Sequence, residues 1–307
     1  MKYLPFLDGK YSVAPGLVPM QKADTSQEKL VFQVDELYPE YFQNKTRCRG
    51  EDMRKYFCEE KFLPVTTVYI NHYIAHQMVR EHPKHFSLEE QAGNYTLSNH
   101  ITGEQLRWDK SWTTVSGNHY LSLFDALCSQ LQEDMAVCQL EEERDWMAAI
   151  HLCAPNHWAA AEKTGKPFDK VHAPVPGMEK TMPHYFKMLN SVVQKGPYTR
   201  FAWGISTDTR LNHHPDPPAG EDSIAWRGRS VQQEHAALFL RVERQNLVGF
   251  PDVNAFLFTI RTYFYAVETL QQEEKMALLS AVASMSDDSL RYKGLIGALP
   301  LLQKQLL

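Results

Sequence analysis

The feature that most constrains the fold is a pair of apolar segments separated by a tight turn. Residues 236–245 and 253–265 are rich in strand-forming side chains, and the turn sequence GFPD occupies 249–252. Apolar segments bounded by glycine and proline in this way predict two antiparallel strands joined as a β-hairpin. An antiparallel sheet is therefore expected in the second half of the chain.

Charged side chains interrupt both strands of this hairpin. Alternation places Arg241 and Glu243 on one face of the first strand and Arg244 on the other. Arg261 and Tyr263 repeat the pattern on the second strand. Charges within a strand usually lie at a solvated edge or pair with each other. The alternative is a polarised pocket, in which a guanidinium donates hydrogen bonds to an anion or a bound oxygen species.

The residues before the hairpin carry alternating strand and helix signals. In chain order we expect a strand over 146–152, a helix capped by Asn156 that extends to 163, a proline-stiffened arm over 171–177, a helix from 182 to Gly196, a strand over 201–205 and a polar loop over 207–233. This order predicts an α+β fold, with an antiparallel sheet packed under helices from the first half of the chain.

The first 143 residues are expected to be mainly helical. The clearest helix covers 118–143, where apolar residues from Leu121 to Cys138 recur at spacings of three and four. Other helices are expected from about Asp35 and over 65–80, with a hairpin or irregular excursion within 86–115. A helical segment over 266–307 completes a single domain whose α+β core spans 144–265.

Composition excludes several classes of function. The chain has 307 residues, with 32 Lys and Arg against 37 Asp and Glu. A slightly acidic chain without a basic stripe argues against nucleic-acid binding. The apolar runs are far shorter than the roughly 20 residues of a bilayer span, and the start lacks the apolar stretch of a secretory signal. We therefore expect a cytoplasmic protein that does not enter a membrane.

Cysteine spacing and missing motifs narrow the chemistry further. The five cysteines include no C-x-x-C pair, which argues against a zinc ribbon, a thioredoxin site and covalent haem attachment. An odd, sparse set of cysteines also fits a reducing compartment. The chain contains no G-x-G-x-x-G, no phosphate-binding loop, no H-E-x-x-H and no G-x-S-x-G motif. Standard dinucleotide, NTPase, metalloprotease and α/β-hydrolase sites are thus not expected.

Three groups of histidines are candidates for chemistry. His72 and His76 share a helix face, as metal ligands do, but no third ligand sits at an obvious spacing. His213 and His214 are interpreted as polar residues of a proline-rich loop. His172 precedes the stiff APVPG arm, which would fix the direction of its imidazole as an axial ligand requires. A structural histidine is the alternative interpretation.

Several sequence blocks resemble a known family. They are residues 153–177 (CAPNHWAAAEKTGKPFDKVHAPVPG), 200–206 (RFAWGIS), 240–245 (LRVERQ) and 258–263 (FTIRTY). In this order they resemble the haem-dependent oxidative N-demethylases, the α-subunit type of dimethylamine monooxygenase. The resemblance extends through most of the chain and is densest over residues 133–265.

This resemblance implies a PAS-like fold that binds haem b without a covalent link. Family enzymes oxidise a small secondary amine with O2 and release formaldehyde. They take electrons from NADPH through a separate flavin and iron–sulfur reductase. The missing dinucleotide loop and cysteine cluster agree with that division of labour.

The resemblance also implies roles for particular residues. His172, in the family's HAPVPG motif, is the expected iron ligand. The RVERQ motif contributes Arg241, Glu243 and Arg244 as catalytic residues, of which one arginine would polarise O2. The remaining expected cofactor contacts from the matching blocks are Pro174, Trp203, Arg261 and Tyr263.

Two departures from the family pattern bear on the substrate. Ala202 and Gly204 stand where the family usually has asparagine and serine, and Arg210 lies in a segment that is normally acidic. A neutral or anionic substrate, or none, is therefore compatible with this chain. The alternatives to an oxygenase are a haem-binding sensor or carrier, and a haem-free interaction protein that docks through its apolar tail over 295–307.

Overall fold

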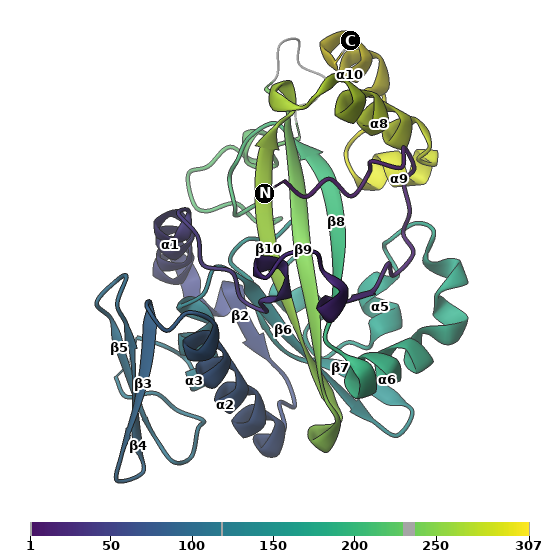
Figure 1. Ribbon diagram of the computed structural model, residues 1–307. Helices are drawn as coiled ribbons and strands as arrows, with labels where there is room; N and C mark the ends of the chain where they lie inside the picture. Colours follow the sequence, from purple (N-terminus) through teal and green to yellow (C-terminus); the bar gives the residue numbers. More distant parts are fainter. Residues whose placement is uncertain (1, 118, 230–236, 307) are drawn as a thin grey trace.

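A seven-stranded antiparallel sheet forms the centre of the molecule (Figure 1). The computed structural model describes residues 2–117, 119–229 and 237–306. In sheet order the strands are β1 (Val18–Pro19), β8 (Tyr198–Ser206), β9 (Phe239–Phe250), β10 (Ala255–Ala266), β6 (Asp134–Glu141), β7 (Arg144–His151) and β2 (Phe57–Glu59). The chain is thus a mixed α/β protein, as the strand and helix signals predict.

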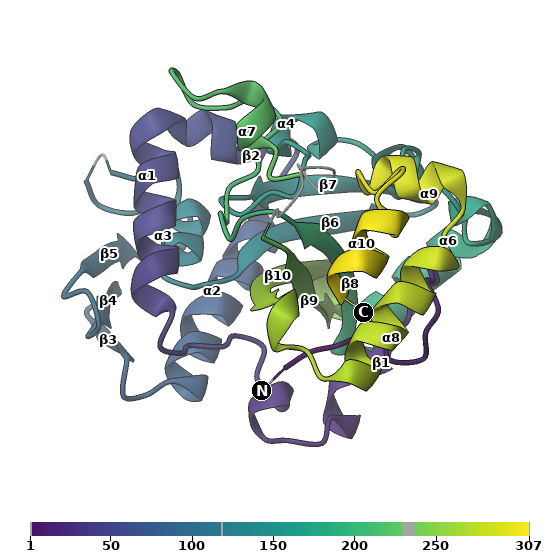
Figure 2. The same ribbon diagram turned by 90° about the horizontal axis from the view of Figure 1, so that it is seen from above.

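Helices cover both faces of this sheet (Figures 1 and 2). One face carries α4 (Ala160–Lys163), α5 (Phe168–His172) and α6 (Tyr185–Lys195), and the other carries α1 (Tyr38–Tyr56), α2 (Pro64–Glu81) and α3 (Leu123–Ser129). Near the other end of β8 to β10 lie α8 (Gln272–Ala283), α9 (Asp287–Tyr292) and α10 (Leu299–Leu306), while α7 (Ser223–Trp226) interrupts the loop after β8. Within the described residues, no helix is long and apolar enough to cross a membrane.

A small second sheet packs beside α2 and confirms the hairpin expected within 86–115. It consists of β3 (Phe86–Gln91), β4 (Asn94–Asn99) and β5 (Gln105–Asp109), paired in that order. Phe86, Leu97 and Leu106 point into the same buried core as the apolar face of α2. The three strands therefore extend the main core rather than form one of their own.

The predicted long hairpin is confirmed. In the pairing of β9 with β10, Phe239 lies opposite Ala266 at one end and Phe250 lies opposite Ala255 at the other. A single turn of 3₁₀ helix at Pro251–Val253 joins the two strands. Position 236, where the first strand was expected to begin, lies outside the described residues. Leu240 and Val242 enter the core under α8 and α10, so Arg241 and Glu243 face the side of α4 to α6. Alternation thus carries Arg241 and Glu243 to this face and Arg244 to the other.

The predicted helix over 118–143 is wrong. Helix α3 ends at Ser129, and the chain continues as strand β6 from Asp134. Strand β6 pairs with β10 on one side and β7 on the other, and helices cover both of its faces. A strand buried on both faces is apolar at nearly every position, so its sequence also satisfies a helical spacing. The first 143 residues are consequently less helical than expected.

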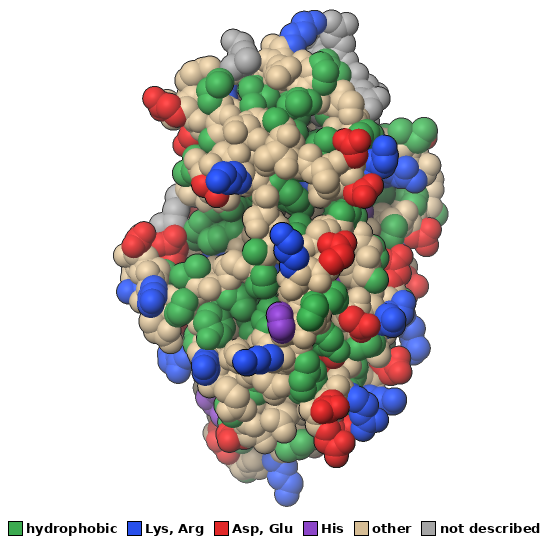
Figure 3. All heavy atoms as spheres, turned by 90° about the vertical axis from the view of Figure 1, so that its right-hand side faces the viewer, with side chains coloured by type: hydrophobic (Ala, Val, Ile, Leu, Met, Phe, Trp, Pro, Cys, Tyr) green, Lys and Arg blue, Asp and Glu red, His purple; other side chains and the backbone are tan. Residues whose placement is uncertain are grey.

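One outer face of the molecule shows how its charges are distributed. On the side seen in Figure 3, acidic and basic side chains are interspersed with apolar ones. The visible face therefore concentrates neither sign of charge.

Candidate functional site

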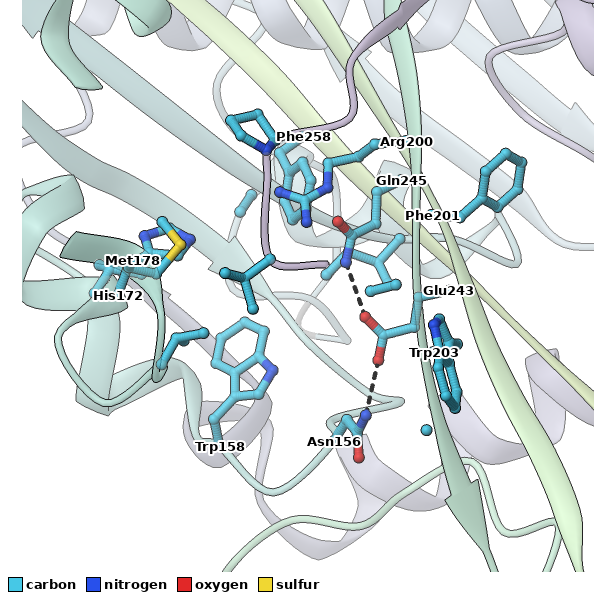
Figure 4. Close-up of a pocket in the computed structure, with 18 of the residues that line it drawn as sticks. Asn156, Trp158, His172, Met178, Arg200, Phe201, Trp203, Glu243, Gln245 and Phe258 are labelled. Atoms are coloured by element: carbon cyan, nitrogen blue, oxygen red, sulfur yellow. Dashed lines mark hydrogen bonds between the residues drawn. The ribbon is translucent and has the colours of Figure 1, made fainter. Parts of the chain in front are cut away.

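A cavity of about 480 Å³ lies between the sheet and helices α4 to α6. Its floor comes from strands β6 to β10, and its walls include residues 11–17 and 292–293 from the two ends of the chain. Most lining side chains are apolar, with a few polar groups that converge on the interior (Figure 4). This size and composition are typical of sites for small molecules and cofactors.

His172 lies in the cavity wall as the last residue of α5. The stiff extended arm predicted over 171–177 is wrong: residues 171 and 172 end α5, and the chain turns over 173–177, where Val175 N–H donates to the carbonyl of His172 at 2.9 Å. Helix α5 starts where Phe168 donates its backbone N–H to Asp145 at 2.6 Å. Val175 and Met178, from the segment that follows, also line the cavity, whereas Pro174 does not.

The His172 imidazole is held in one tautomer. Its Nδ1 lies 2.9 Å from the carbonyl oxygen of Phe168, which can only accept a hydrogen bond, and the ring stacks on Phe168 at 3.9 Å. Burial lowers the pKa of His172 to about 4. At neutral pH the ring is therefore uncharged, with its proton on Nδ1 and a lone pair on Nε2. An axial metal ligand has this arrangement.

Glu243 places a carboxylate on the cavity floor across from His172 (Figure 4). Its Oε1 accepts a hydrogen bond from Asn156 at 3.2 Å, and its Oε2 accepts one from Gln245 at 2.9 Å. Asn156 was expected to cap a helix, but α4 begins after Ala159. Two neutral amides thus orient the carboxylate, and Arg241 Nε lies 3.8 Å from its Oε1 as an ion pair.

Arg241 is buried beside Glu243 and holds two loops together. Its Nη1 donates to the carbonyl of Leu211 at 3.2 Å and to His213 Nδ1 at 3.0 Å. Its Nη2 donates to the carbonyls of Ala154 at 2.7 Å and Pro155 at 3.3 Å. The terminal nitrogens are therefore engaged by the protein, and Nε, which has no hydrogen bond, lies 3.8 Å from Glu243 Oε1 as a buried ion pair.

His213 is fully buried behind Arg241, so its interpretation as loop polarity is wrong. It is 1% exposed, and its Nε2 lies 2.9 Å from Asp208 Oδ1. Because Arg241 can only donate to Nδ1, the proton of His213 is on Nε2 and points at Asp208. Burial lowers the pKa of His213, against the opposing effect of Asp208. Gly228 packs directly against this imidazole, and a Cβ at that position would lie 2.5 Å from His213 Nε2.

His214 is also buried, at 6% exposure. Its backbone N–H donates to Asn212 and its ring lies edge-on to Tyr56. It is thus a packed residue outside the cavity rather than a loop residue in solvent.

Sequence reasoning missed Arg200 as a residue of the site, as it missed Lys163, Arg229 and Lys293. The Nε of Arg200 is buried without a partner, and its guanidinium makes no hydrogen bond or ion pair among the described residues. It lies beside Gln245, its cross-strand neighbour (Figure 4). The available signal was alternation: Arg200, Ala202 and Gly204 share the polar or small face of β8.

Three expected site residues lie on the opposite face of the sheet. Arg261 contacts both oxygens of Asp35 at 3.0 and 3.1 Å, and Tyr263 donates to Gln33. Arg244 donates to two main-chain carbonyls of the N-terminal segment, at 2.7 and 2.8 Å. These side chains tie the hairpin to residues 28–35 and do not line the cavity.

Trp203 is a lining residue of β8, but its ring belongs to the core beneath α8 and α10. The ring packs against Phe6 with 5.4 Å between centroids. Its carbonyl accepts a hydrogen bond from Lys293 at 2.7 Å, which brings an ammonium to the cavity wall.

The cavity wall is rich in cations. Lys163 lies over the ring of Trp158, and Arg229 donates to the carbonyl of Tyr292. Burial lowers the pKa of Lys163 to about 8 and that of Arg229 to about 10. Among the described lining residues, Glu243 is the one carboxylate. The site therefore favours ligands that bring negative charge.

His72 and His76 form no metal centre with a third described residue. Their rings stack at 3.9 Å and pack against Trp112. His76 Nδ1 is engaged by the main-chain carbonyl of His72. The packing interpretation of this pair therefore fits the structure.

A buried group of Asp134, His151 and Cys153 has ligand atoms within 4.8 Å of one another. Both oxygens of Asp134 already accept main-chain N–H groups, and the Lys45 ammonium lies 3.9 Å away. The Lys45 ammonium thus already supplies a positive charge beside this carboxylate. This group is therefore a structural network.

Fold and cavity together define a mixed α/β protein with an internal pocket of a size typical of small-molecule and cofactor sites. Residues 22–298 match the family of the haem-dependent oxidative N-demethylases, alpha subunit-like. Because the match covers most of the chain, the protein belongs to this family, which confirms the resemblance of the sequence blocks. The family is one of haem-dependent oxidative enzymes.

The described residues fit a haem group. His172 offers a neutral imidazole whose Nε2 has no hydrogen-bond partner among the described residues. Arg229 and Lys293 offer cations for the two carboxylates of a haem. Apolar side chains such as Leu189 complete the lining.

Proposed function

We propose that this protein is a haem-dependent monooxygenase that removes a methyl group from a small amine. In balance, one oxygen atom of O2 leaves in formaldehyde with the former methyl carbon. The other leaves as water, with two electrons and two protons supplied from outside. The single observation that carries the proposal is the neutral His172 imidazole in one cavity with the Glu243 carboxylate.

The residues of the cavity take distinct parts in this proposal. The Nε2 atom of His172 is the ligand for a non-covalent haem b, which when bound supplies the redox centre for O2. Glu243 binds the ammonium of the substrate, oriented by Asn156 and Gln245. Arg241 keeps the surrounding loops closed and holds its Nε 3.8 Å from Glu243. The apolar walls exclude water from the reacting groups.

Three residues that were expected in the site lie outside the cavity but anchor the hairpin that carries it. Arg244, Arg261 and Tyr263 tie β9 and β10 to the N-terminal segment. We assign them the role of holding Arg241 and Glu243 in position. Pro174 and Trp203 would lie near the haem pocket without contacting the haem through their rings.

The proposal extends to the fold and the partner. The sheet combines the hairpin β6–β7 with the meander β8–β10, and helices connect the two in the chain. Strands β6 and β10 pair and so join both parts into one sheet, which supports a PAS-like core in a single domain. The family's alpha-subunit description supports a separate flavin and iron–sulfur reductase as the electron donor. A cytoplasmic location is part of the same proposal.

The test is the visible spectrum of protein purified from haem-supplemented cells, before and after dithionite and CO. We expect a Soret band of histidine-ligated type that shifts with CO, and formaldehyde release from a secondary amine with a surrogate reductant. Protein that shows no Soret band, even after addition of haemin, would contradict the proposal.

A haem-binding sensor or carrier is the second candidate. Ala202 and Gly204 face Glu243 and Arg241 across the strands, so two positions on the cavity floor lack polar side chains. A floor with fewer hydrogen-bond donors favours gas binding over turnover. Haem-loaded protein that binds CO but releases no formaldehyde from any amine would favour this candidate.

A further inference from the structure

Arg200 is the cation of the cavity whose charge the protein leaves unmatched. Of the cations among the described lining residues, it alone has no hydrogen bond, ion pair or aromatic contact, and its Nε is buried without a partner. A buried donor without an acceptor is costly, unless a ligand supplies the acceptor. We therefore expect the guanidinium to bind an anionic group of a ligand.

The position of Arg200 relative to Glu243 is set by the register of two strands. Arg200 pairs with Gln245 and Ala202 pairs with Glu243, so Arg200 and Glu243 are diagonal neighbours on one face. Such neighbours have Cα atoms roughly 7–8 Å apart. Gln245 lies between the two charges and bonds to Glu243 (Figure 4). The guanidinium and the carboxylate are thus close but do not form an ion pair.

The charge balance of the cavity points the same way. The described lining residues include five cations and one carboxylate. The two carboxylates of a haem would still leave two cations in excess. A substrate with only a positive charge would add to that excess, whereas a substrate with an added carboxylate would not.

We propose that the substrate is an N-methyl amino acid, in which a secondary amine and a carboxylate are joined by a short spacer. The ammonium binds Glu243 and the carboxylate binds Arg200. This inference rests on the proposed function and names the substrate class of that same site. It differs from the family expectation of a simple amine.

The first experiment compares three probes by calorimetric titration of the haem-loaded protein: N-methylglycine, dimethylamine and acetate. We expect N-methylglycine to bind at least about tenfold more tightly than either probe that carries one of its two charges. Equal or tighter binding of dimethylamine would overturn the inference. This comparison uses the wild-type chain, so it does not depend on how any variant folds.

The second experiment assigns the contact. Arg200→Gln should weaken N-methylglycine about tenfold or more and leave dimethylamine unchanged, while Arg200→Lys should restore part of the loss. Arg210→Gln is the matched control, because Arg210 lies outside the cavity lining and bonds to Trp226.

Two further outcomes separate this inference from the function on which it rests. Loss of haem from Arg200→Gln, with unchanged probe binding per haem, would assign Arg200 to the cofactor and overturn the inference. A wild-type protein that takes up no haem would instead contradict the proposed function.

Discussion

At the scale of single residues, the site depends on where protons are placed. The carbonyl of Phe168 draws the His172 proton to Nδ1, and Arg241 draws the His213 proton to Nε2. Both imidazoles are uncharged in the folded protein because burial lowers their pKa values. The arrangement exposes one basic nitrogen, that of His172, to a ligand in the cavity.

His172→Ala should abolish or strongly weaken haem binding and leave the fold intact. The alanine removes the ligand nitrogen, while the helix that carries it is held by the Asp145 contact to Phe168. Haem content per protein and the far-ultraviolet circular dichroism spectrum measure the two expectations. An unchanged Soret band in this variant would show that another residue holds the iron.

Protonation also makes stability depend on pH. Burial lowers the pKa of His157 to about 2 and that of His172 to about 4, while the unfolded chain titrates both near 6.5. The unfolded state therefore takes up protons first, and these groups make the protein less stable as the pH falls from 7 towards 4. Glu133 opposes this trend, because burial raises its pKa to about 7.

His157→Asn isolates one of these contributions. We expect urea unfolding of the haem-free variant to lose less stability between pH 7 and pH 4.5 than the wild type loses. Parallel curves for the two proteins would mean that His157 takes up its proton over the same pH range in the folded and unfolded states.

At the scale of elements, close backbone contact fixes the helix that roofs the cavity. Gly249 of β9 lies against the end of α6, where a Cβ would be 2.2 Å from the carbonyl oxygen of Val193. Backbone atoms cannot move aside as a flexible side chain can. Helix α6 therefore rests directly on the strand.

Gly249→Ala should destabilise the protein by about 1–3 kcal/mol, because the added methyl group forces α6 away from β9. Gly50→Ala is the matched control, since a Cβ there meets nothing within 4 Å on the exposed surface of α1. That control should be neutral or stabilising by up to about 1 kcal/mol. Chemical denaturation of both variants checks the pair, and equal stabilities would refute the contact.

Elements with a contrast between two faces, or with clear turn residues at their ends, are the ones that the sequence predicts well. The apolar stripe of α6 and the alternation of β8 reflect such a contrast. The hairpin β9–β10 is buried on both faces, and it is the turn sequence at 249–252 that marks it. Strand β6 has no such difference, because all but its last residue is buried, and it was taken for a helix. A pattern of hydrophobicity cannot distinguish a helix from a strand where neither face meets water.

At the scale of the whole molecule, the site is assembled from parts far apart in the sequence. Motifs predicted the face that Arg241 and Glu243 share, because neighbours in one strand obey alternation. They did not predict that Arg244, Arg261 and Tyr263 would contact the N-terminal segment instead of the cavity. The partners of a side chain across a sheet depend on topology, which no local spacing encodes.

The proposed monooxygenase activity requires a source of two electrons. The chain has no dinucleotide-binding loop and no cysteine cluster for an iron–sulfur centre. We expect no formaldehyde from amine, O2 and NADPH with this protein alone, and turnover when a flavin and iron–sulfur reductase is added. NADPH-driven turnover by the isolated chain would contradict the separate reductase.

The cavity joins two segments that are nearly three hundred residues apart. Tyr11 and Lys293 both line it, and the ammonium of Lys293 lies over the Tyr11 ring. A molecule that fills the cavity touches both segments at once and behaves as a non-covalent cross-link between them. A ligand in the cavity should then make both segments more resistant to proteases.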